Sequence, residues 1–188
     1  TVALARLWTL SQLEGDDSRS CIRNLLKHDD ASVRLAALNA VSLHRDAAGY
    51  SQVIELLNTD VAPNRRAAAE AIGRLENERA VPRLLAAAAG SPSDRVLQHS
   101  ITYALIELAD VNATSAGLSN KAPGTRAAAL VALDQMPGGR IDPQQVIPLL
   151  DSKDETLRYA ARWLVARHTD WGGQLSDWFR NQLATLPD

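Results

Sequence analysis

Apolar positions along the chain follow the helical period of 3.6 residues, and the pattern itself recurs. The first stretch carries Val2, Leu4, Leu7 and Leu10, and alanine-rich stretches of the same kind follow at regular intervals. Six copies align on their last aliphatic residue: Leu10, Val41, Ile72, Leu105, Leu133 and Val165. The steps between these anchors are 28 to 33 residues long. A period of this length predicts stacked helical repeats.

Each later copy is preceded by a second helical stretch that bears leucine or another aliphatic residue. These leading stretches are Ile22–Leu26, Val53–Leu57, Val81–Ala89, Val111–Leu118 and Val146–Leu150. One unit is therefore a helix, a tight turn and a helix, which cannot bury its apolar face without a neighbour. The sequence predicts an all-α, right-handed α–α superhelix of about five helical hairpins, with a single core running from end to end.

The period also sets unit boundaries within one domain, residues 1–188. We expect a partial repeat at 1–15, repeats at about 16–46, 47–77, 78–109, 110–138 and 139–169, and a cap helix at 172–187. The fourth unit has a polar leading helix and the shortest step, so we expect it to be irregular. The chain opens in helical periodicity without an initiator Met, which indicates a segment of a longer protein whose other part would cover Leu4, Leu7 and Leu10.

Two residue types recur at fixed places in the second helices. Small residues that let helices approach closely are Ala37, Ala40, Ala68, Ala71, Ala129, Ala132 and Ala161. An arginine ladder, Arg34, Arg65, Arg126 and Arg158, begins four of these helices, and Gln98 replaces it in the third unit. We expect a structural role, with each arginine bridging to a turn carboxylate (Asp29, Asp60 or Asp154) four or five residues earlier.

The string Asp29-Asp30-Ala31-Ser32-Val33-Arg34, followed by the alanine-rich run, resembles the short HEAT repeat, including the variant found in phycobilisome-lyase-like proteins. The resemblance implies an armadillo-like helical solenoid that serves as a scaffold and a protein-binding surface. Residues 5–15 are more weakly similar to HEAT segments inside bacterial multidomain extracytoplasmic redox proteins. That second likeness implies a docking platform between other domains of one polypeptide.

The second helices of stacked hairpins line the concave side of a solenoid. The residue after the arginine position and the residue four places later share one helical face. From this register we predict a protein-binding concave row: Trp8, Asn39, Arg66, Glu70, His99, Tyr103, Tyr159 and Trp163. Tyr and Trp are typical of recognition hot spots, although Trp8 and Trp163 could instead fill gaps between helices near the ends.

Charge and composition narrow the choice of partner. Lys and Arg number 20 against 22 Asp and Glu, so the net charge is −2 and neither nucleic acid nor membrane is the expected partner. No apolar run approaches the length of a membrane span. Cys21 is the single cysteine, which rules out an internal disulfide, and its place in a leading helix predicts a buried side chain.

No catalytic constellation is visible in the sequence. The four histidines lie in different elements, no pair has the spacing of metal ligands, and no nucleophile elbow occurs. We therefore expect no cofactor, no metal and no enzyme activity, but a scaffold that binds a separate protein or another domain of the same polypeptide. Two alternatives remain: an accessory subunit of a bilin-lyase-like enzyme and, more distantly, a HEAT enzyme similar to DNA glycosylases.

Overall fold

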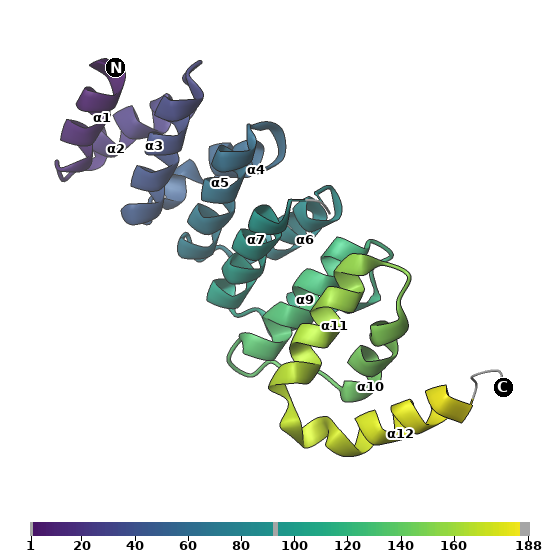
Figure 1. Ribbon diagram of the computed structural model, residues 1–188. Helices are drawn as coiled ribbons and strands as arrows, with labels where there is room; N and C mark the ends of the chain where they lie inside the picture. Colours follow the sequence, from purple (N-terminus) through teal and green to yellow (C-terminus); the bar gives the residue numbers. More distant parts are fainter. Residues whose placement is uncertain (1, 92–93, 185–188) are drawn as a thin grey trace.

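A computed structural model describes residues 2–91 and 94–184 of the protein. These residues form an all-α, HEAT-like solenoid (Figure 1). The helices in chain order are α1 Val2–Ser11, α2 Asp16–Leu25, α3 Ala31–Leu43, α4 Tyr50–Thr59, α5 Ala62–Arg74, α6 Val81–Ala89, α7 Arg95–Leu108, α8 Val111–Ser115, α9 Pro123–Gln135, α10 Pro143–Val146, α11 Glu155–Arg167 and α12 Gly172–Ala184. These described ranges contain no strand, and none of their helices is long and apolar enough to cross a membrane.

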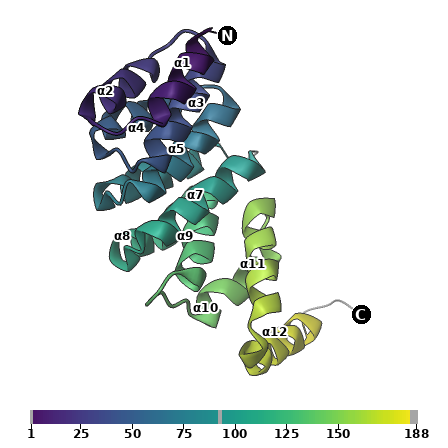
Figure 2. The ribbon, with the colours of Figure 1, turned by 90° about the vertical axis from the view of Figure 1, so that its left-hand side faces the viewer.

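The second helices of the pairs form the continuous backbone of the stack. α3, α5, α7, α9 and α11 have 13 or 14 residues each, and each packs against the next. The leading helices shorten along the chain, from 10 residues in α2 to 5 in α8 and 4 in α10. Figure 2 shows the second helices toward the C-terminal end, where α9 lies between α7 and α11 and contacts both. The second helices therefore provide the regular face of the molecule.

The recurring alanines lie in the core, as the sequence predicts. All seven are buried, and several have no exposed surface, as at Ala37, Ala68 and Ala129. The core is not one uninterrupted cluster, however. A main cluster reaches from Leu7 to Met136, and two smaller clusters lie beneath α11. The half-buried Leu118 and Ile141 pack against both the main cluster and the cluster around Leu164, so apolar contacts connect the two.

The arginine ladder joins neighbouring repeats through partners that differ from those expected. Arg34 donates to both carboxylate oxygens of Asp60 in the following repeat, and its Nη1 donates to the carbonyl oxygens of His28 and Asp29 at 2.8 Å. Its predicted partner, the Asp29 carboxylate, is not used. The arginine is long enough to span the turn, so it satisfies the free carbonyls at the end of the leading helix and reaches the next unit.

The remaining ladder positions vary on this theme. Arg65 donates to the carbonyl oxygen of Leu57 and to Ser91 Oγ in the following turn, and Arg158 donates to the carbonyl oxygens of Ser152 and Lys153. Gln98 Nε2 donates to the carbonyl oxygens of Ala88 and Ser91. The glutamine therefore binds the carbonyls of the preceding turn, as the arginines do. The Arg126 side chain lies in a shallow pocket beside Leu130 and makes none of the side-chain hydrogen bonds found in residues 2–91 and 94–184. Its backbone N–H donates to the carbonyl oxygen of Ala122.

The two ends of the stack are built differently. Leu7 is buried because α1 packs against α2 and α3, whereas Leu4 and Leu10 are half-buried against the core. At the other end, α12 contains no fully buried residue, and Phe179 is exposed; residues 185–187 of the expected cap lie outside the described residues. Trp171, which precedes α12, is the buried residue that closes the last cluster.

Candidate binding groove

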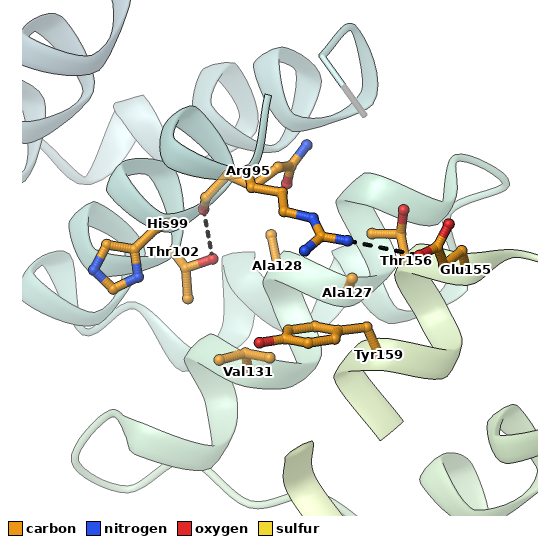
Figure 3. Close-up of a pocket in the computed structure, with 10 residues that line it drawn as sticks. Arg95, His99, Thr102, Ala127, Ala128, Val131, Glu155, Thr156 and Tyr159 are labelled. Atoms are coloured by element: carbon orange, nitrogen blue, oxygen red, sulfur yellow. Dashed lines mark hydrogen bonds and ion pairs between the residues drawn. The ribbon is translucent and has the colours of Figure 1, made fainter. Parts of the chain in front are cut away.

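Three neighbouring second helices contribute one strip each to a single groove (Figure 3). Within a strip the residues are four apart, so they lie one above the other on one helical face. The strip of α7 is Arg95, His99 and Tyr103; that of α9 is Ala127, Val131 and Gln135; and that of α11 is Glu155, Tyr159 and Trp163. These nine residues define what we call the groove.

The groove has two connected parts that differ in chemistry. The part between Arg95 and Glu155 has a volume of about 570 Å³, and the part at Tyr103 and Trp163 has about 290 Å³. His99, Val131 and Tyr159 line both parts. Eight residues of helix separate the ends of a strip, so the groove is about 12 Å long. It therefore has a charged end and an aromatic end.

Small side chains on α9 give the groove its depth. Ala127 and Ala128 line the charged part, and both are buried almost completely. The side chains of α7 and α11 are larger, so they stand as walls on either side of this floor (Figure 3). Tyr103 and Tyr159 remain 46% and 63% exposed, which leaves most of the Tyr159 ring available to a ligand.

The charged end is closed loosely by Arg95. Its guanidinium reaches from α7 across to α11, where Nη2 lies 3.6 Å from Glu155 Oε1 (Figure 3). The Arg95 Cζ also lies 5.6 Å from the centre of the Tyr159 ring. At the other end, Arg167 Cζ lies 4.7 Å from the centre of the Trp163 ring. Both rings on α11 thus already contact a cation.

The structure brings together four residues of the predicted concave row: His99, Tyr103, Tyr159 and Trp163. The other four do not line this groove. Arg66 donates to Asp94 Oδ1 at 3.0 Å, and Glu70 Oε1 accepts a hydrogen bond from Ser100 at 3.2 Å.

Trp8 and Asn39 are exposed on α1 and α3, far from the groove in the chain order of the stack. The competing interpretation expects Trp8 to fill a gap between helices. Trp8 is 68% exposed, so it does not. Trp163 partly does, because it is half-buried and packs against the cluster around Leu164. A binding role for the row as a whole stays a prediction.

Sequence reasoning missed Arg95 and Glu155 in the groove. The signal was available: Arg95 lies four residues before His99, and Glu155 lies four residues before Tyr159. Extending the predicted register by one helical turn toward the N-terminus of each helix would have included both. The same extension in the other direction finds Gln135, four residues after Val131.

Other reactive side chains give no second site. Cys21 is exposed, so the prediction of a buried thiol was wrong; it lies in α2, and the next residue, Ile22, is the buried one. His168 Nε2 lies 2.5 Å from Asp134 Oδ1, and His44 Nε2 lies 3.0 Å from the carbonyl oxygen of Ser11. Across the described ranges, no group of three or more His, Cys, Asp or Glu side chains could hold a metal ion.

Comparison with known proteins identifies the type of repeat. Residues 22–106 match the family model of HEAT repeats. No curated protein matches the chain. Among solved structures, the chain is similar to an engineered protein studied by the Northeast Structural Genomics Consortium, with 16% identity, a TM-score of 0.47 and 85% coverage of each chain.

Proposed function

We propose that this protein binds a protein segment in the groove between α7, α9 and α11. Residues 22–106 match the model of HEAT repeats, which commonly serve as protein-interaction scaffolds, and this match supports a binding role. The segment belongs to a separate protein or to another domain of the same polypeptide. In this role the protein positions its partner and performs no reaction of its own.

The observation that carries the proposal is the exposure of aromatic side chains inside a groove. Tyr103 and Tyr159 stand on opposite walls with large exposed surfaces, and Val131 of α9 lines the groove with them. Burying such rings against a partner removes apolar surface from water at a small cost in side-chain entropy.

Unused hydrogen-bonding groups in the groove support the same conclusion. Within residues 2–91 and 94–184, the Tyr103 and Tyr159 hydroxyls and the His99 ring take part in none of the hydrogen bonds found. These groups can therefore pair with the backbone of an extended segment without breaking a contact inside the protein. A groove about 12 Å long accommodates roughly four residues of extended chain.

Comparative affinity capture tests the proposal. The double variant Tyr103→Ser, Tyr159→Ser removes both exposed rings and changes no buried side chain. The control, Leu43→Ser, Phe179→Ser, removes two exposed apolar side chains outside the groove. We expect a partner that the wild type and the control retain equally and that the groove variant binds about tenfold more weakly or worse. Equal retention by all three proteins contradicts the proposal.

A further inference from the structure

The charged end of the groove points to the chemistry of the partner, and this inference rests on the proposed function. We propose that Glu155 and Tyr159 form a recognition site for a basic side chain, and that Arg95 occupies this site in the free protein as a replaceable internal substitute. The partner segment accordingly carries an arginine or lysine, which displaces Arg95 when the segment enters the groove.

The geometry of α11 supplies the two halves of a cation site. Glu155 and Tyr159 are four residues apart and therefore project from the same face of the helix. A carboxylate attracts a cation directly, and the face of an aromatic ring attracts it through the ring quadrupole. Arg95 makes both contacts at once, at 3.6 Å from the carboxylate and 5.6 Å from the ring centre. The site thus accepts a guanidinium group in this structure.

Arg95 is held weakly enough to be replaced. Its distance from Glu155 exceeds the range of a good hydrogen bond, and the two side chains are 79% and 78% exposed. Exposed ion pairs contribute little because water screens them and because both side chains lose freedom. A basic side chain on a bound segment would make the same two contacts under cover of the partner, where they are stronger.

The groups around the site favour a cation over an anion. Along α11, the Glu155 carboxylate and the faces of Tyr159 and Trp163 all attract positive charge, and Trp163 already lies beneath Arg167. An acidic side chain would gain Arg95 alone and would meet the Glu155 carboxylate. The net charge of −2 acts in the same direction at longer range.

Two matched peptides test the proposal directly: acetyl-Gly-Arg-Gly-amide and acetyl-Gly-Glu-Gly-amide, each titrated into the protein while the Tyr159 ring signals are followed by NMR. We expect the arginine peptide to shift these signals. Arg95→Gln should raise its affinity about threefold to tenfold, because the internal competitor is removed. Glu155→Gln should lower that affinity by a similar factor.

Arg140→Gln is the control, because Arg140 is exposed in the turn between α9 and α10 and lines no part of the groove. It should leave the affinity unchanged. Tighter binding of the glutamate peptide, weakened by Arg95→Gln, would overturn the inference and make Arg95 an anion contact in a functional groove. If neither peptide shifts the Tyr159 signals in any variant, the inference is also overturned. The capture experiment tests separately whether the groove binds a partner.

Discussion

Asp60 is the residue whose charge is tied most closely to the packing of repeats. Its side chain is 2% exposed and accepts hydrogen bonds from Arg34 of the preceding repeat, from Asn64 and from the Val61 backbone N–H. These donors, the Arg34 hydrogen bond above all, lower the pKa of Asp60 from 3.8 to about 2. Because the pKa is lower in the folded protein, the ionised form stabilises the fold, by about 2 kcal/mol.

This stabilisation is present above pH 4 and is lost as the pH falls from about 4 to about 2. Asp60→Asn should lower the free energy of unfolding by about 2 kcal/mol at pH 7, and the difference from the wild type should shrink across that acidic range. Urea unfolding at a series of pH values measures it. Asp29→Asn, at an exposed carboxylate, serves as the control, and parallel acid curves for wild type and Asp60→Asn would contradict the account.

The sequence predicted the recurring arginine of the second helices, but it did not predict the partner of Arg34. The spacing places an arginine at the start of four second helices, and a nearby carboxylate in the same turn is the simplest partner. The actual partner of Arg34 lies 26 residues further along the chain. Which carboxylate is reached depends on the rotation between successive units, and a single unit's sequence does not contain that rotation.

Helix α9 approaches α6 and α7 closely at Gly124. A Cβ atom built there would lie 2.5 Å from the carbonyl oxygen of Ala88 and 3.0 Å from Gln98 Nε2. These two groups hydrogen-bond to each other, so the glycine lies against the contact that joins α6 to α7. The absence of a side chain at Gly124 therefore lets three helices meet.

Gly124→Ala should destabilise the protein by about 1–3 kcal/mol, because either α9 or the Ala88 carbonyl must shift. Gly173→Ala is the matched control: Gly173 lies in α12, and a Cβ atom there meets nothing within 4 Å. Alanine should be neutral or stabilising at that site by up to about 1 kcal/mol. Thermal unfolding of both variants measures the contrast, and equal effects would contradict the close approach.

The fourth hairpin has a short and irregular leading helix. Its leading helix α8 has 5 residues and continues as a 3₁₀ segment, Ala116–Ser119, whose hydrogen-bond geometry is poorer. The hydroxyl of Thr114 is buried there and finds no hydrogen-bond partner. The sequence anticipates this irregularity through its polar composition and short step.

Amide hydrogen exchange should accordingly be faster in residues 110–121 than in α5 or α7, since local opening there breaks fewer contacts. Exchange measured by mass spectrometry on peptic fragments resolves these segments. Protection of residues 110–121 equal to that of α7 would show that the unit is as stable as its neighbours, against this prediction.

At the scale of the molecule, periodicity alone predicted the all-α solenoid, because every repeat buries the same alanine and aliphatic positions. The register of the groove was also predictable, since the i, i+4 rule places His99 with Tyr103 and Tyr159 with Trp163. The sequence could not tell that only the α7, α9 and α11 strips enclose this groove. That depends on the spacing and rotation between successive second helices, which the i, i+4 pattern within one helix does not contain.

Site-specific photo-cross-linking tests the central claim, that this protein uses the groove to hold its partner. A photoreactive phenylalanine placed at Tyr103 or Tyr159 probes the groove, and the same group at Leu43 or Val61 probes exposed apolar positions elsewhere. We predict cross-links to one partner segment from both groove positions and none from the two outer positions. Cross-links from Leu43 or Val61, with none from the groove, would contradict the account.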